Sequence, residues 1–469
     1  MTRTVELPLW LLVLVLGFAA VTFASHFLLP SVRWFLRRRM ERLVARLNTR
    51  LERPIEPFKL MRRQDMIVRL VHDPAVMQAV VDHARETGAP ESVAFQEAQK
   101  YAREIVPGFS ALVYFGFATQ AARWLSRALY RVRVGKVDAA LAQIDRQATV
   151  IFVMNHRSNM DYVLVTWLVA GRSALSYAVG EWARVWPLSR LIRAMGAYFI
   201  RRNSRNPLYR RVLARYVQMA TAEGATQAVF PEGGLSLDGR VGAARMGLLS
   251  YIVAGFDPAG RDVVFVPTAI AYDRVLEDRL LVEAGQIGVR RFRAQPLAMA
   301  GFVARMVWRM IRGRFPGFGT AAVAFGAPIS LRGFLAREGA TTESLGAALM
   351  AEVAQSVPVL PVPLVAASLA GGPVARAGLT VRVDGLTERL NALGAVMKLP
   401  LTGAAEAGLR VLEARGIVAE GAAGLTAAPG QEALLAFYAA PVLQRLEAGV
   451  ETAPMEVPEV FGEYTHSIT

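Results

Sequence analysis

The stretch that decides the fold is ATVIFVMNHRSNMDY, residues 148–162. Its first half, residues 148–154, is apolar and rich in β-branched side chains, which predicts a buried strand. Residues 160–170 are apolar and compatible with a helix, for which Ser158 or Asn159 is the natural N-cap. The sequence therefore predicts a strand, a short polar loop and a helix.

The loop carries a histidine, and an aspartate follows five residues later. Two helical residues at this spacing lie about 140° apart around the helix axis. His156 and Asp161 can therefore meet only if His156 lies in the loop and Asp161 in the first helical turn. Asp161 would then accept a hydrogen bond from one imidazole nitrogen and leave the other free to take a proton. A surface histidine beside a capping carboxylate is the alternative for this spacing taken alone.

Three further blocks place polar residues at the ends of apolar runs. GAYFIRR (196–202) ends in two arginines, VFPEGGLS (229–236) holds a carboxylate and two glycines, and VFVPTAIAY (264–272) is an apolar run interrupted by Pro267. Basic strand ends and glycine turns are common individually. The order and spacing of all four blocks carry more information than any one of them.

In this order, the blocks resemble the four motifs of the membrane-bound glycerolipid acyltransferase family, which includes a His-x4-Asp motif. HRSNMDY (156–162), GAYFIRR (196–202) and EGGLS (232–236) are most similar to its glycerol-3-phosphate acyltransferase branch. The resemblance covers about residues 100–330, and residues 437–443 faintly resemble the C-terminal helical region of that branch. It implies transfer of a fatty acyl group from a thioester donor to the hydroxyl of glycerol 3-phosphate in phospholipid synthesis.

The resemblance implies that His156 and Asp161 are the catalytic residues of this O-acyltransferase. A glycerol hydroxyl is a poor nucleophile at neutral pH, so His156 would act as its general base while Asp161 orients the imidazole and stabilises the imidazolium. The chain contains no cysteine, which excludes a cysteinyl acyl-enzyme intermediate. Direct transfer from a thioester is the simpler scheme, because a thiol leaves readily.

The residues expected to bind the substrates lie in or near the same blocks. Phosphate recognition calls for arginine or for a nest of backbone N–H groups, and the resemblance implies that Glu232 and Gly233 position the acceptor. The full expected set is Arg157, Ser158, Arg201, Arg202, Glu232, Gly233, Gly234, Ser236, Arg240 and Arg245. Positions 235 and 237 are leucine where related acyltransferases commonly carry arginine. We therefore expect the phosphate to be bound by the other arginines near these blocks, which are Arg201, Arg202, Arg240 and Arg245. A solvated surface charge is the alternative for any one of them.

Composition and charge indicate a membrane setting. The chain is 54% hydrophobic and carries a net charge of +16. Residues 7–32 have no formal charge, and a cluster of arginines follows between positions 33 and 53. This pattern predicts a single membrane-spanning anchor over residues 1–32, with the catalytic domain on the cytoplasmic face. A cleaved signal peptide is the alternative, but it should have a basic start and a shorter apolar core.

Two later segments suit a membrane surface. Residues 109–125 are rich in aromatic side chains and are followed by basic residues, which predicts either a helix in the membrane interface or an ordinary core helix. Residues 290–314 have the pattern of an amphipathic basic helix. The arginine cluster between positions 33 and 53 would also bind anionic headgroups.

The chain divides into five predicted regions: an anchor (1–32), a helical, basic, membrane-proximal region (33–144), an α/β catalytic domain (145–356), a helical C-terminal subdomain (357–450) and a tail (451–469). Predicted strands at 150–154, 175–179, 198–201, 227–230, 263–269 and 321–325 alternate with helices, which predicts an α/β fold with a mixed, largely parallel sheet flanked by helices. Motif residues at the carboxyl ends of such strands would converge in one crevice. In the C-terminal subdomain, helices are expected at 364–369, 386–393, 404–415 and 431–446, and residues 379–383 have the alternation of a strand.

Other classes of protein fit the sequence less well. It has no recognisable nucleic-acid-reading motif, no Gly-x-Ser-x-Gly of a serine hydrolase, and no two of its five histidines at metal-site spacing. We therefore expect no metal, no nucleic-acid partner and no cofactor other than acyl-CoA or acyl carrier protein as acyl donor. The expected partners are membrane lipids, the acyl thioester donor and a phosphorylated glycerol acceptor. Acylation of lysophosphatidate or another lysolipid, and a non-catalytic membrane scaffold, remain as alternatives.

Overall fold

The computed structural model describes residues 8–23, 38–39, 42–135, 141–180, 188–201, 204–288, 301, 305–306, 308–313, 315, 317–395 and 403–448. The chain forms two compact units, Met1–Ile55 and Glu56–Thr469, and the second contains the sheet and every site discussed below.

The first unit contains the apolar helix α1 (Leu9–Phe23), which is 15 residues long. Among the described residues, no helix combines the length and the apolar character needed to cross a bilayer. The predicted anchor over residues 1–32 includes residues 1–7 and 24–32, which lie outside the described residues. The anchor therefore stays a prediction.

One mixed sheet organises the described part of the second unit. Its strand order is β1 (Arg131–Val134), β7 (Thr320–Phe325), β6 (Val263–Tyr272), β2 (Thr149–Met154), β5 (Gln227–Val229), β3 (Ser176–Val179) and β4 (Tyr198–Phe199), and β8 (Ile329–Ser330) also pairs with β6. The strands from β6 to β4 are parallel, whereas β7 and β8 run antiparallel to β6. The predicted mixed, largely parallel sheet is confirmed, and its six predicted strands are all present. The short strands β1 and β8 were not predicted, because β1 alternates arginine with valine and β8 has only two residues.

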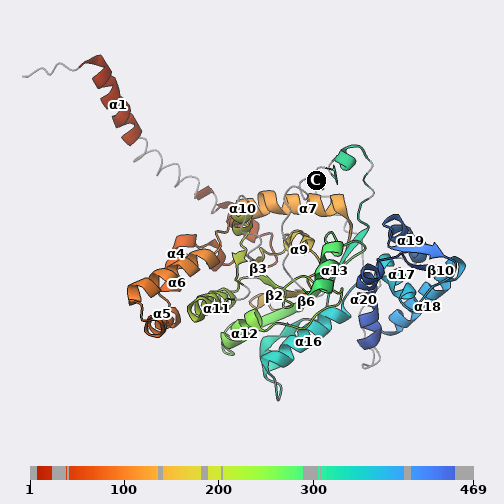
Figure 1. The fold of residues 1–469 in the computed structure, drawn as a ribbon. Coiled ribbons are helices and arrows are strands. Elements are labelled where there is room, and N and C mark those ends of the chain that lie inside the picture. Colours follow the sequence, from red (N-terminus) through yellow and green to blue (C-terminus); the bar gives the residue numbers. More distant parts are fainter. Residues whose placement is uncertain are drawn as a thin grey trace, which may run out of the picture. The chain divides into compact units, whose positions relative to one another are not determined.

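Helices cover both faces of this sheet. Along β2, the side chains of Val150, Phe152 and Met154 enter one hydrophobic core, and those of Ile151 and Val153 enter the other. Figure 1 shows α7 (Thr119–Leu129) and α9 (Met160–Val169) on one side of β2 and β6, with α11 (Pro207–Ala222), α12 (Gly247–Ala254) and α16 (Thr342–Gln355) on the other. The remaining helices of the α/β part and its N-terminal flank are α3 (Pro57–Leu60), α4 (Arg63–Val71), α5 (Pro74–Thr87), α6 (Glu91–Ile105), α10 (Leu188–Ala194), α13 (Asp278–Ile287) and α15 (Leu331–Leu335).

The carboxyl ends of the parallel strands meet at one edge of the sheet. The register of β2 with β6 ends at Met154 and Thr268, but β6 continues as far as Tyr272, paired there with β7. Just beyond the last β2–β6 pair, the side-chain amide of Asn155 pairs with the main chain of Ile270 in β6. Its Nδ2 donates to Ile270 O at 3.0 Å, and its Oδ1 accepts from Ile270 N at 2.8 Å. The side chain thus extends the β2–β6 ladder and fixes where the following loop begins.

The aromatic segment predicted over residues 109–125 forms a seven-residue π-helix, η2 (Leu112–Ala118), that continues directly into α7. One side of this helix is buried, including Tyr114, whereas Leu112, Phe117 and Trp124 are 60%, 60% and 65% exposed. The segment therefore packs on the core along one face and presents an apolar face to its surroundings. Most of the predicted basic helix over residues 290–314 lies outside the described residues.

The C-terminal part is mostly helical, as predicted. It contains α17 (Pro361–Leu369), the short 3-10 helix η4 (Arg376–Gly378), α18 (Leu379–Ala392), α19 (Ala404–Ala414), α20 (Glu432–Ala448) and a hairpin of β9 (Val418–Gly421) and β10 (Gly424–Ala427). The strand expected over residues 379–383 is wrong, because these residues open α18. Leu379, Val383, Leu386 and Leu390 are buried at helical spacing, whereas Val381 is 75% exposed. The predicted tail lies outside the described residues.

Candidate active site

The site is built on the loop between β2 and α9. His156 Nδ1 lies 3.0 Å from Asp161 Oδ2, and both side chains are buried. Asp161 is the second residue of α9, so the structure brings the pair together in the arrangement that their spacing requires.

Asp161 accepts four hydrogen bonds. Besides the imidazole, Oδ2 accepts from the backbone N–H groups of Arg157 at 2.7 Å and Ser158 at 2.9 Å. Oδ1 accepts from the Tyr272 hydroxyl at 2.7 Å. The carboxylate is thus held in one orientation by the loop and by the end of β6. Tyr272 was not predicted as a site residue, although it is the last residue of the fourth block.

Two aromatic rings enclose the imidazole of His156. The ring centroids of Phe230 and Tyr162 lie 4.2 and 5.3 Å from that of His156. Within the described residues, His156 Nε2 has no hydrogen-bond partner. An imidazole with one nitrogen on a carboxylate and the other unoccupied is suited to accept a proton from a bound hydroxyl.

The third block holds the main chain of His156 from both sides. Glu232 Oε1 accepts from His156 N at 3.1 Å, and Ser236 N donates to His156 O at 2.8 Å. Burial raises the pKa of Glu232 to about 8. Burial therefore favours the protonated form of the Glu232 carboxyl, and the block fixes the position of the histidine loop.

The other residues of the third block shape the turn. Gly233 has a φ of +68°, and a Cβ there would lie 2.8 Å from Cδ of Arg245. The Ser236 hydroxyl donates to Arg240 O at 2.8 Å and accepts from Gly239 N at 3.0 Å. Gly234 is buried in the same turn. In this structure Ser236 closes a loop that positions Gly233 beside Arg245.

The polar side chains of Arg157 and Ser158 are engaged by other parts of the protein. The buried Arg157 guanidinium donates to Gly239 O and lies 4.7 Å from the ring centroid of Phe437 in α20. Burial lowers the pKa of Arg157. The Ser158 hydroxyl donates to Glu277 Oε2 at 2.8 Å. Both residues therefore brace the histidine loop against the C-terminal part and the segment before α13.

The four predicted phosphate-binding arginines have different surroundings. Arg201 forms a two-pronged ion pair with Glu104, at 2.8 and 2.6 Å, and Arg240 forms one with Glu447 of α20, at 2.6 and 2.7 Å. Arg202 lies outside the described residues. Within the described residues, Arg245 forms no ion pair.

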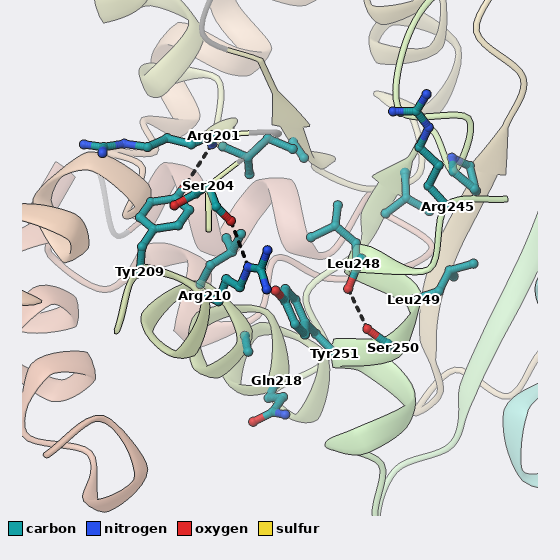
Figure 2. A pocket seen from close by; sticks show the side chains of 18 of the residues that line it. Arg201, Ser204, Tyr209, Arg210, Gln218, Arg245, Leu248, Leu249, Ser250 and Tyr251 are labelled. Atoms are coloured by element: carbon teal, nitrogen blue, oxygen red, sulfur yellow. Dashed lines mark hydrogen bonds between the residues drawn. The ribbon is translucent and has the colours of Figure 1, made fainter. Parts of the chain in front are cut away.

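A cavity of about 750 Å³ opens between α11 and α12, next to the rings that enclose His156. Tyr162 and Phe230 belong to its lining, as do Arg201 and Arg245 from the second and third blocks. Figure 2 shows Arg201 and Arg245 on opposite sides, and Arg210 of α11 reaching from Ser204 towards Tyr251 of α12. Arg211 completes the basic lining, and the described lining contains no acidic side chain. Arg210 and Arg211 were missed because they lie inside a helix rather than in a motif block.

The wall of the cavity between these arginines is apolar, with Leu213, Leu248 and Leu249 among its residues. The combination suits an anionic ligand with an apolar part. Among the described residues, no group of three or more His, Cys, Asp or Glu side chains is arranged to hold a metal ion.

Two family models match this chain. Residues 137–271 match the model described as acyltransferase, and residues 304–443 match the model described as glycerol-3-phosphate acyltransferase C-terminal region. The first match covers the first three sequence blocks and all but the last residue of the fourth. The second includes the part of α20 that contacts Arg157.

Curated relatives include glycerol-3-phosphate acyltransferases of two Pseudomonas species. That of Pseudomonas putida strain GB-1 is 30% identical over 331 residues, which cover 66% of this chain and 38% of that protein. That of Pseudomonas entomophila strain L48 is 30% identical over 303 residues, which cover 63% of this chain and 35% of that protein. The matched region thus spans little more than a third of these relatives.

A solved structure with some likeness is the crystal structure of the 1-acyl-sn-glycerophosphate acyltransferase PlsC from Thermotoga maritima. The likeness covers 62% of this chain and 96% of that chain, with 18% sequence identity and a TM-score of 0.32.

Proposed function

We propose that this chain is a member of the acyltransferase family whose models match residues 137–271 and 304–443, and that it transfers a fatty acyl group from a thioester donor to the hydroxyl of glycerol 3-phosphate. The observation that carries the proposal is the buried His156–Asp161 pair, 3.0 Å apart, with Nε2 of the imidazole unoccupied within the described residues. In this reaction Nε2 takes the proton of the acceptor hydroxyl as its oxygen attacks the thioester carbonyl. The C–S bond then breaks, and the imidazolium returns the proton to the thiolate.

The acceptor phosphate is assigned to the arginines that line the cavity. Of the predicted phosphate-binding arginines that the structure describes, Arg245 is the best placed, because Arg201 and Arg240 are each neutralised by a glutamate. Arg210 and Arg211 add positive charge at the same cavity. Glu232 and the Gly233 turn hold the loop between these arginines and His156.

The proposal includes a location on the cytoplasmic face of a membrane. The apolar residues 7–32, the arginines that follow them and the exposed face of η2 and α7 support it. Membrane lipids would then be partners, and either acyl-CoA or acylated acyl carrier protein would be the donor.

A second acceptor class is favoured by one observation. The cavity is larger than a three-carbon phosphate requires, and its leucine-lined wall lies between arginines. Lysophosphatidate, which joins a phosphate to an acyl chain, would occupy both parts. Acylation of a lysolipid is therefore the alternative function.

The test is an assay of the purified full-length protein in lipid micelles, crossing glycerol 3-phosphate and lysophosphatidate with acyl-CoA and acylated acyl carrier protein. We expect transfer to glycerol 3-phosphate, and we expect His156→Ala to lower it by at least about a thousandfold, since the general base is lost. The variant should keep the wild-type melting temperature within a few degrees. Near-normal transfer by His156→Ala would refute the mechanism, and no transfer to either acceptor would favour a non-catalytic scaffold.

A further inference from the structure

We propose that Tyr272 is a positioning residue for the His156–Asp161 pair, holding the carboxylate so that one of its oxygens stays on the imidazole. The inference rests on the proposed acyltransferase function. Its basis is the hydrogen bond from the Tyr272 hydroxyl to Asp161 Oδ1, at 2.7 Å between two buried side chains.

The two carboxylate oxygens of Asp161 have unequal support. Oδ2 accepts from His156 Nδ1 and from two backbone N–H groups, whereas Oδ1 accepts only from Tyr272 among the described residues. Asp161 has no exposed surface, so bulk water does not reach Oδ1 to replace the hydroxyl. A buried carboxylate oxygen without a donor carries a large desolvation cost. The tyrosine therefore supplies a contact that nothing else in the described surroundings provides.

The sheet holds the hydroxyl in place. Tyr272 is the last residue of β6 and pairs with Ala321 of β7. It lies four residues beyond Thr268, the last β6 residue that pairs with β2. The Asn155 amide ties this part of β6 to the start of the histidine loop through Ile270. The ring of Tyr130 lies 5.2 Å from the Tyr272 ring, between centroids. Burial raises the pKa of Tyr272 well above its usual value, so the phenol stays protonated and can donate.

Loss of this hydroxyl should change the chemistry rather than substrate binding. With no donor at Oδ1, the carboxylate can rotate or take up a proton, and either change weakens its bond to the imidazole. The imidazolium formed during transfer is then less stabilised. The titratable and charged groups around Asp161 that could also respond are His156, Tyr130, Arg157, Glu232, Tyr272 and Glu277.

The decisive variant is Tyr272→Phe, which removes only the hydroxyl. We expect kcat to fall by about tenfold or more, with KM for both substrates within about twofold of wild type, as for an interaction made mainly in the transition state. We also expect the acid limb of the kcat–pH profile to move to lower pH, because the imidazolium loses stabilisation. A purely structural tyrosine would not shift that limb.

Tyr130→Phe is the matched control. It also removes one hydroxyl from a buried tyrosine next to the same ring, but Tyr130 OH donates to the Arg274 backbone carbonyl at 2.9 Å and not to Asp161. We expect kcat within about twofold of wild type and an unchanged pH profile for this variant. If Tyr272→Phe behaves like Tyr130→Phe in both kcat and pH profile, the inference is overturned.

A second measurement covers the case in which Tyr272→Phe does not fold. Site-specific replacement of Tyr272 by 3-fluorotyrosine keeps the hydroxyl but makes it a stronger donor, and it should shift the acid limb relative to wild type. An unshifted limb would contradict the inference. Failure of the underlying function looks different, because wild-type protein would then transfer no acyl group, or His156→Ala would transfer as well as wild type.

Discussion

Glu232 shows how one buried side chain couples the site to pH. Its carboxyl accepts from the backbone of His156, and burial raises its pKa from 4.5 to about 8. Between these two values the folded protein holds a proton that the unfolded chain has released. The unfolded state gains from that release, so the free energy of unfolding falls as pH rises through this window, by up to about 1.4 kcal/mol per pH unit.

We therefore expect the free energy of unfolding of Glu232→Gln to fall less steeply than that of wild type between pH 5.5 and 7.5. Glutamine keeps an oxygen to accept from His156 N but does not titrate. The measurement is chemical denaturation at several pH values for both proteins. Glu277, whose pKa is also raised by burial, contributes a slope of the same sign that remains in both proteins and cancels in the comparison. Equal slopes would show that Glu232 is ionised in the folded protein.

Sequence patterns reveal some of these residues and not others. The five-residue spacing of His156 and Asp161 is local, so the geometry of one loop and one helical turn specified how the two could meet, but the three further blocks were needed to favour that contact over a surface histidine. Tyr272 and Asn155 act across 111 and 115 residues of sequence, to Asp161 and to Ile270. Such contacts depend on strand order and register, which a single sequence does not specify. The ion pair between Arg201 and Glu104 could not be predicted from the sequence for the same reason.

At the scale of elements, the helix formed by η2 and α7 has one face without a protein partner in the described structure. Leu112, Phe117 and Trp124 are largely exposed there. Burial of such side chains at a bilayer surface is favourable by roughly 25 cal/mol per Å² of apolar area. The sequence alone left open whether this segment is a core helix or an interfacial one, and the structure shows one buried face and one exposed apolar face.

We expect this face to enter the membrane interface. Because the chain contains no cysteine, Phe117→Cys provides a single site for an environment-sensitive fluorophore. Its emission should shift to the blue when anionic phospholipid vesicles are added. Val381→Cys, at a position in α18 that is 75% exposed, is the matched control and should not shift. Equal responses at both positions would argue against a specific membrane face.

Prediction of helices and strands from the sequence succeeded where the apolar residues fitted only one pattern. It failed where they fitted both the two-residue period of a strand and the longer period of a helix. Buried strands such as β2 and β6 form continuous apolar runs bounded by turns, and both were found. Residues 379–383 alternate like a strand, but their burial follows the longer helical pattern that runs through Leu386 and Leu390. Five residues are too few to separate the two periods.

At the scale of the molecule, the C-terminal part is joined to the active-site loops by α20. Phe437 packs on Arg157, Gln444 exchanges hydrogen bonds with the backbone of Val241, and Glu447 pairs with Arg240. Gly239 lies at the centre of this contact. Its φ is +88°, and a Cβ there would lie 2.0 Å from Phe437 O.

We expect Gly239→Ala to lower the free energy of unfolding by at least about 3 kcal/mol, since it adds both a backbone clash and an unfavourable φ. Gly288→Ala is the matched control, because Gly288 has a φ of +71° but a Cβ added there would meet no atom within 4 Å. It should cost only about 1 kcal/mol, from the backbone conformation alone. Denaturant titrations of the two variants compare the costs, and similar values would mean that α20 can move away from the loop.

The contact between α20 and the loop after His156 also has a consequence for biosynthesis. Residues 437–447 are synthesised after all four motif blocks, yet they complete the surroundings of Arg157, which directly follows His156. A nascent chain that has exposed all four motif blocks still lacks this support. Under the proposed function, the histidine loop therefore becomes complete only after α20 has been synthesised and has packed on it.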